Sequence, residues 1–136
     1  MPKFTVKQTA YEMQLDLKRE NQDLLLILTG GDVPHFGVVT TLTKTTTPAT
    51  VRFPSHAGRL HKENVLTERL ANKLQSQLTG TCTIIGGVHV NQITQAQIDA
   101  SFTMVDTLAN QALNWLNLHP AKQVAISYAK LSKPTK

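Results

Sequence analysis

The chain has 136 residues, 40% hydrophobic and 17% charged. This composition is typical of one globular domain that folds without disulfides or a structural metal. No apolar run is long enough to span a bilayer, the amino terminus has no signal-peptide core, and Cys82 is the single cysteine, so we expect a cytoplasmic protein and no membrane partner. Residues 120–136 hold four lysines and no acid, which accounts for +4 of the net charge of +5, and the near-neutral remainder gives little reason to expect nucleic-acid binding.

The first third of the chain predicts strands. Residues 4–18 alternate between apolar and polar side chains and predict one half-exposed strand. After a turn at residues 20–23, the apolar run at 24–28 predicts an interior strand that is covered on both faces. Gly30-Gly31 ends that run, and the threonine-rich residues 37–43 predict a third strand. The short spacing favours an antiparallel meander.

The middle of the chain predicts an irregular connection followed by a helix. Residues 44–54 are rich in threonine and contain Pro48 and Pro54, which block regular ladders. Gly80 ends the predicted helix, which is indicated by apolar residues at helical spacing: Val65, Leu66, Leu70, Ala71, Leu74 and Leu78.

The last part of the chain predicts another strand and a second helix. Residues 81–90 form the strand, in which Gly86-Gly87 indicates a bulge or a close backbone approach. Thr94 and Gln97 have capping-box spacing and predict the start of a short helix. A second apolar stripe runs from Val105 to Leu116, and residues 124–128 alternate briefly, as in a last edge strand.

The element order predicts an α+β fold in which a largely antiparallel sheet is covered by two amphipathic helices. We assign residues 1–120 to this single domain and residues 121–136 to a basic, solvated tail.

The polar stretch from Arg52 to Asn64 is the most unusual segment, because an ordinary connection has no use for so many long hydrogen-bonding side chains. Arg59 and Lys62 stand just before the helix, where unpaired backbone N–H groups favour an anion such as phosphate. The alternative is a helix terminus with two solvated bases. His89 and Asn91 lie near the end of a predicted strand. They either form a polar cluster with Thr94 or are simply solvated residues at the strand end.

Catalysis by the chain alone finds little support in the sequence. Ser55 precedes His56 without a nucleophile elbow, and Cys82 lies among apolar residues as a core side chain would. Four histidines lie in loops or beside glycine or proline: His35, His56, His61 and His89. None has zinc-site spacing on one element, so backbone hydrogen bonding, ligand contact and a metal centre assembled across the fold all remain open.

Three stretches carry a family resemblance: TGGDVPHFGVVTTLT, VRFPSHAGRLHKENVLTERLA and GTCTIIGGVHVNQITQAQI. Together they resemble the LpdD-like prenylated-flavin chaperones, the small D proteins that accompany gallate decarboxylase. The resemblance runs from about Phe4 to Pro120 and leaves out the lysine-rich tail. It implies a fold similar to that of proteasome-assembly chaperones, a homodimer, and a non-catalytic protein that passes reduced prenylated FMN to a UbiD-type decarboxylase.

The resemblance transfers no residue roles, so the expected cofactor contacts are our own inference from the polar positions inside the matching motifs. They are His35, Arg52, Ser55, His56, Arg59, His61, Lys62, His89 and Asn91. Two other hypotheses use the same residues. In one the chain is a structural subunit of the decarboxylase complex, and in the other it is a histidine-based metal-dependent enzyme.

Overall fold

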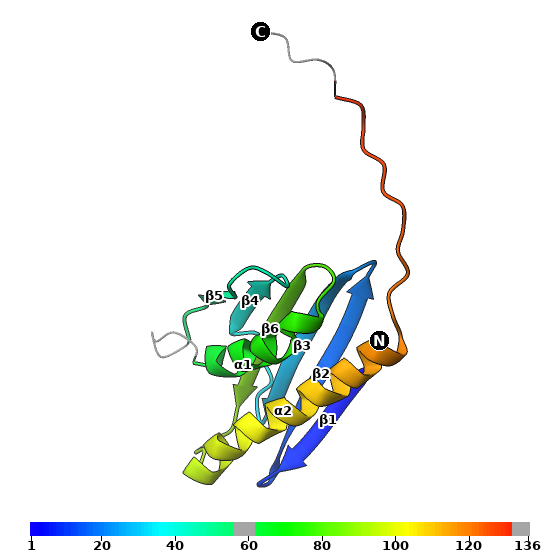
Figure 1. Cartoon of the computed structure of the whole chain (residues 1–136). Helices are drawn as coiled ribbons and strands as arrows, with labels where there is room; N and C mark the ends of the chain where they lie inside the picture. The colour runs from blue at the N-terminus through cyan, green and yellow to red at the C-terminus, as the bar shows by residue number, and fades with distance from the viewer. Residues whose placement is uncertain (56–61, 132–136) are drawn as a thin grey trace.

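The computed structural model describes residues 1–55 and 62–131 (Figure 1). The strands are β1 (Lys3–Gln8), β2 (Tyr11–Glu20), β3 (Asp23–Gly31), β4 (Val38–Leu42), β5 (Ala49–Arg52) and β6 (Cys82–His89). The helices are α1 (Asn64–Leu74), which continues into a short 3₁₀ turn (Gln75–Gln77), and α2 (Gln95–Leu118). Among the described residues, no helix is long and apolar enough to cross a bilayer.

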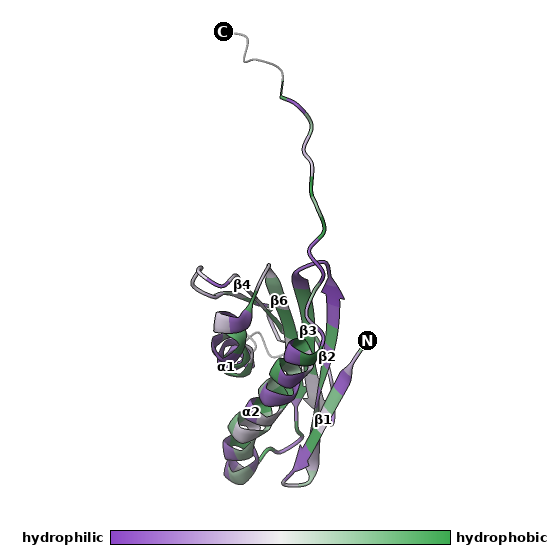
Figure 2. Cartoon of the chain, turned by 45° about the vertical axis from the view of Figure 1, so that its right-hand side comes forward, coloured by the Kyte–Doolittle hydropathy of each residue, from purple (hydrophilic) through white to green (hydrophobic). Residues whose placement is uncertain are grey.

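The strands form one sheet in the order β1-β2-β3-β6-β4-β5, and β3–β6 is its only parallel pair within the described ranges. Both helices lie on the same side of this sheet (Figure 2). The predicted α+β class, with a largely antiparallel sheet and two covering helices, is confirmed. The prediction of a continuous antiparallel meander is wrong, because β6 lies between β3 and β4 and separates two strands that follow each other in the chain.

The first predicted strand is two strands joined by a tight turn. Thr9 and Ala10 have φ values of 49° and 63°, the left-handed conformation that a two-residue hairpin needs. The turn folds β1 back along β2, so that Val6 lies opposite Met13. Neither turn residue is glycine or asparagine, the usual markers of such a turn, and we therefore missed it.

The core lies between the sheet and the two helices. Alternate residues of β2 and β3, such as Leu15 and Leu26, are fully buried against the helices, as are Leu70 of α1 and Leu108 of α2. Burial of apolar side chains at helical and strand spacing is what makes these segments form helices and strands here. Cys82 belongs to this core, and burial raises the pKa of its thiol to about 12, which confirms a packing role for this cysteine over a reactive one.

The α2 helix is one long element where we expected a short helix and a separate stripe. The predicted capping box is confirmed, because the Thr94 hydroxyl accepts from the Gln97 backbone N–H and the Gln97 side chain accepts from the Thr94 backbone N–H. Farther along, Arg69 of α1 donates two hydrogen bonds of 2.7 Å to Asp106 of α2. These bonds lower the pKa of the Asp106 carboxyl and tie the two helices together.

The face of the sheet that is turned away from the helices is not covered by another described element. Leu25 and Ile27 alternate with buried core residues and stay partly exposed, so the expectation that residues 24–28 are covered on both faces is wrong for this single chain. The segment predicted to be irregular also contains the short edge strand β5, which pairs with β4. Its β-branched Thr50 and Val51 suit a strand, whereas the prolines lie outside it.

The chain leaves the domain after α2. Arg19 donates a hydrogen bond to the His119 carbonyl, and Gln22 donates one to the Lys122 carbonyl. Beyond that point, residues 123–131 are exposed and form neither helix nor strand, and the described part of the tail extends away from the domain (Figure 1). The predicted edge strand at residues 124–128 is therefore wrong.

Candidate functional site

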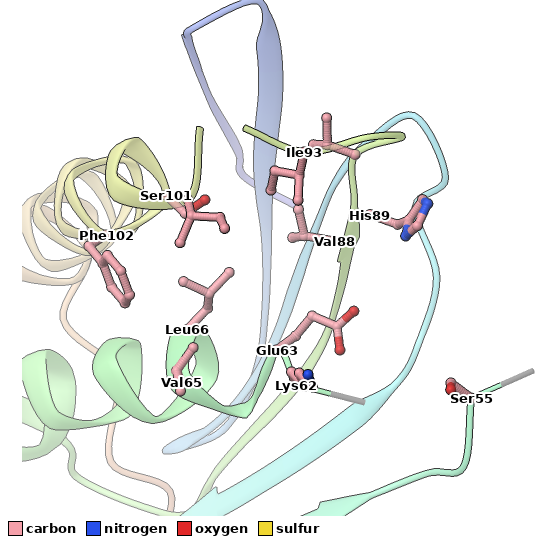
Figure 3. Close-up of a pocket in the computed structure, with 12 residues that line it drawn as sticks. Ser55, Lys62, Glu63, Val65, Leu66, Val88, His89, Ile93, Ser101 and Phe102 are labelled. Carbon is pink, nitrogen blue, oxygen red and sulfur yellow. The ribbon is translucent and has the colours of Figure 1, made fainter. Parts of the chain in front are cut away.

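A pocket of about 680 Å³ opens between the start of α1, the end of β6 and the first turns of α2 (Figure 3). This volume lies within the range of roughly 300–1,000 Å³ that is usual for small-molecule sites. Apolar side chains make most of its wall: Val65, Leu66, Val88, Val90, Ile93, Ile98 and Phe102. Its polar lining residues are Ser55, Lys62, Glu63, His89 and Ser101. An apolar wall with a few polar groups suits a flat ring system that carries a polar edge.

One polar contact at the pocket joins Glu63 to His35. The Glu63 carboxylate lies 3.0 Å from His35 Nε2, and the two side chains are only 15% and 24% exposed. The other ring nitrogen, His35 Nδ1, lies 2.9 Å from the Val33 carbonyl. A loop before β4 thus fixes the position of a carboxylate at the start of α1.

Gly87 is what allows this loop to lie so close to β6. A Cβ atom at Gly87 would lie 1.8 Å from the His35 carbonyl oxygen, far inside van der Waals contact. The His35 N–H also donates to the Gly87 carbonyl at 3.4 Å. The close backbone approach predicted from Gly86-Gly87 is therefore confirmed, and its consequence is the placement of His35 beside Glu63.

His89 and Asn91 form a polar pair at the end of β6. His89 Nε2 lies 3.0 Å from the Asn91 side-chain oxygen, so the ring donates there. The Asn91 backbone N–H donates in turn to the Asp32 carboxylate at 2.7 Å. The predicted cluster thus contains His89 and Asn91 but leaves out Thr94, whose hydroxyl caps α2.

Ser101 lies on the opposite wall, but its hydroxyl is already used. It donates to the Gln97 carbonyl at 2.8 Å and accepts a hydrogen bond from the Tyr11 hydroxyl. Burial raises the pKa of Tyr11, so the phenol stays protonated as the donor. Since a serine has one proton to donate, Ser101 offers a ligand no donor.

Comparison with known proteins shows the family to which this chain belongs. Residues 7–117 match the model of the prenylated flavin chaperone LpdD-like domain. Protein LpdD of Lactiplantibacillus plantarum is 52% identical over 122 residues, which cover 90% of each chain. The chain belongs to the LpdD-like prenylated flavin chaperone family. The resemblance read from the three motifs is confirmed over nearly the range we gave it.

In this LpdD-like domain the predicted contact residues only partly come together. Ser55, Lys62 and His89 line the pocket, while His35 and Asn91 adjoin it through Glu63 and His89. Arg52 ends β5 and is not among the lining residues. His56, Arg59 and His61 lie outside the described residues, and their roles stay predictions.

Sequence reasoning missed Glu63 and the whole apolar wall. Glu63 looked like one more polar residue before a helix, and its importance appears only when His35, far away in the chain, lies beside it. The apolar residues at the end of β6 and the start of α2 were not singled out, because the predicted second stripe began only at Val105. Val88 and Phe102 are only partly buried, as expected for side chains that line an open pocket.

The described residues contain no group of three or more potential metal ligands placed to share an ion. Of the four loop histidines in the metal hypothesis, His35 and His89 have hydrogen-bond partners of other kinds, namely Val33, Glu63 and Asn91. The other two lie outside the described residues.

Proposed function

We propose that this protein binds reduced prenylated FMN and delivers it to a UbiD-type decarboxylase that acts on hydroxylated, gallate-like aromatic acids. The observation that most supports this proposal is the pocket of about 680 Å³ with an apolar wall and a polar rim, in a chain of the prenylated flavin chaperone family. The apolar wall suits the flavin ring and its added prenyl carbons, and Lys62 at the rim suits the phosphate. The proposed role is non-catalytic and cytoplasmic.

A transfer experiment tests this function. Purified protein is loaded anaerobically with reduced prenylated FMN and mixed with cofactor-free decarboxylase, and decarboxylation of gallate is followed against free cofactor at the same concentration. We expect faster or more complete activation with the loaded protein. Equal activation by free cofactor at all concentrations would argue against delivery.

The structural-subunit hypothesis makes a different prediction for the same pair of proteins. A carrier must leave the decarboxylase after transfer, whereas a subunit stays in a stoichiometric complex. Size-exclusion chromatography of the two proteins after activation therefore separates these hypotheses. Metal analysis of protein purified without a chelating tag tests the metal-dependent enzyme.

We also propose that the protein forms a homodimer through the uncovered face of the sheet. Ile27, Ile85, Val39 and Val51 are neighbours in register across β3, β6, β4 and β5, and their strand alternation places them opposite the helices. The β1–β2 half of that face instead pairs Lys3 with Asp16 and Lys7 with Glu12. Trp115 on α2, in contrast, is stacked on His119, and the Arg19 guanidinium lies over its ring.

Val51→Glu should shift the protein to a monomer, because it places a charge on an apolar face that the second copy would bury. Val51 is 62% exposed in the single chain, so the monomer should still fold. Light scattering at a protein concentration on the order of tens of micromolar measures the change in molecular mass. Thr5→Glu, on the charged half of the same face, is the matched control and should stay dimeric. A monomeric wild type would contradict the proposal.

Truncation after Pro120 should change the affinity for the cargo by no more than about threefold. The tail leaves the domain after α2, and its described residues line no part of the pocket. Anaerobic titration of the truncated and full-length proteins compares the two affinities. A loss of about tenfold in a truncated protein that still folds would mean that the tail contacts the cargo.

A further inference from the structure

The pocket has a charged end and an apolar end. Lys62 and Glu63, which precede α1, supply the ammonium group and the carboxylate of its lining. Among the described residues, α2 supplies only three lining side chains, Ile98, Ser101 and Phe102. The Ser101 hydroxyl is already hydrogen-bonded within the protein. The α2 side is therefore the apolar end (Figure 3), and the hydrocarbon part of a ligand is favoured there when its phosphate lies near Lys62.

The Phe102 ring at this end is held by an arginine from the other helix. The Arg69 guanidinium lies over the ring, with its Cζ atom 5.4 Å from the ring centroid, which is within the range of a cation–π contact. Arg69 also donates two hydrogen bonds of 2.7 Å to the two carboxylate oxygens of Asp106. Phe102 and Asp106 are four residues apart and share one face of α2. A carboxylate of α2 thus fixes an arginine of α1 over a phenyl ring one turn away.

Stability alone does not explain this arrangement. The Arg69 and Asp106 side chains are 41% and 24% exposed, and ion pairs that reach water add little to stability. A pair with two parallel N–H bonds does fix the orientation of the guanidinium plane. Phe102 is only partly buried and lines the pocket, so the pair keeps a half-exposed ring in a set position before a ligand arrives. Such preorganisation favours binding, because less side-chain freedom is lost when the ligand binds.

We propose that the Phe102 ring is the surface on which the prenyl carbons of the cargo pack, and that Arg69, fixed by Asp106, is its positioning residue. The prenyl carbons are the part of the cargo that plain FMN lacks, and they carry no polar group. The phosphate then lies at the charged end of the pocket, near Lys62. This inference rests on the proposed function and adds to it the residue that distinguishes prenylated FMN from plain FMN.

Anaerobic titration of each variant with reduced prenylated FMN and with plain reduced FMN tests this inference. Phe102→Ala should weaken the binding of the prenylated cofactor by at least about tenfold, the loss expected when a large apolar contact disappears. The binding of plain FMN should weaken by no more than about threefold, so the ratio of the two affinities falls. Phe102→Leu retains an apolar side chain and should give an intermediate ratio, which keeps the test decisive if the alanine variant misfolds.

Arg69→Gln should lower the same ratio by about threefold or more, because the phenyl ring is no longer held in position. Arg69→Lys keeps the charge without the two parallel bonds and should also lower the ratio. If Arg69 acts through Phe102, then adding Arg69→Gln to Phe102→Ala should change the ratio no further. Additive effects of the two substitutions on the ratio would overturn the positioning role of Arg69.

Phe4→Ala and Lys73→Gln are the matched controls. Phe4 is another partly buried phenyl ring, on β1 and outside the pocket. Lys73 lies 3.6 Å from the Asp106 carboxylate and does not line the pocket. Both variants should keep the wild-type ratio. If wild type binds no prenylated FMN, the proposed function and the inference both fall. If wild type binds it, but the preference over plain FMN is absent or survives in both Phe102→Ala and Phe102→Leu, the inference alone is overturned.

Discussion

Ile98→Glu should weaken the binding of prenylated FMN by at least about 100-fold, or about 3 kcal/mol. Ile98 lies in the first turn of α2, lines the pocket and is 38% exposed. In the free protein a glutamate there can reach water, and an acid near the start of a helix is favourable. Once the cargo covers the pocket, that carboxylate loses water, and it also repels the anionic phosphate. The penalty therefore falls on binding and not on folding.

Ala96→Glu provides the matched control for this variant. Ala96 is in the same helical turn and exposed, and it does not line the pocket. The two substitutions add the same charge at nearly the same place along the helix, so any general effect of charge on the cargo is shared. We expect Ala96→Glu to bind the cargo as wild type does. Equal weakening by both variants would place the cargo elsewhere.

Gly87→Ala should lower the free energy of unfolding by about 2–3 kcal/mol, the usual cost of forcing an atom into a filled site. The added Cβ would lie 1.8 Å from the His35 carbonyl oxygen, so either β6 or the loop before β4 has to move. Without this contact the same change would stabilise the strand by about 0.5–1 kcal/mol, because alanine loses less backbone entropy than glycine. A lower free energy of unfolding would therefore show that the loop lies against β6, and a higher one would show that it does not.

Thr29→Ala is the control for the glycine substitution, because Thr29 is the register partner of Gly87 on β3. It changes a partly exposed side chain and should cost less than about 1 kcal/mol. Urea unfolding of the three proteins measures the difference, provided each unfolds in one cooperative transition. If Gly87→Ala equals or exceeds wild type in stability, then His35 is not held beside Glu63 in the way described.

The sequence predicted the elements whose signal is local and periodic. The stripes of α1 and α2, the alternation of β2 and the capping box at Thr94 each follow from residues within one or two turns of each other. The hairpin at Thr9-Ala10 also left a local signal that we did not use. Apolar residues occupy even positions at Phe4 and Val6 but odd positions from Tyr11 onward, and a single half-buried strand cannot change faces in this way.

The remaining features depend on contacts between distant parts of the chain. Insertion of β6 between β3 and β4 is set by long-range pairing that no local pattern contains. Gly86-Gly87 indicated a close approach, but the sequence did not say that His35 approaches there. For the same reason the contact of Glu63 with His35 and the apolar wall of the pocket were not predicted. Residues with obvious chemistry were found, whereas the cavity between them was not.

Anaerobic titration of the purified protein with reduced prenylated FMN, beside plain reduced FMN, tests the central claim most directly. The pocket between α1, β6 and α2 is the proposed site, so wild type and Ala96→Glu should bind the prenylated cofactor alike and more tightly than plain FMN, while Ile98→Glu should lose this binding. The claim would be contradicted if wild type failed to bind the prenylated cofactor, or if Ile98→Glu bound it as tightly as Ala96→Glu does.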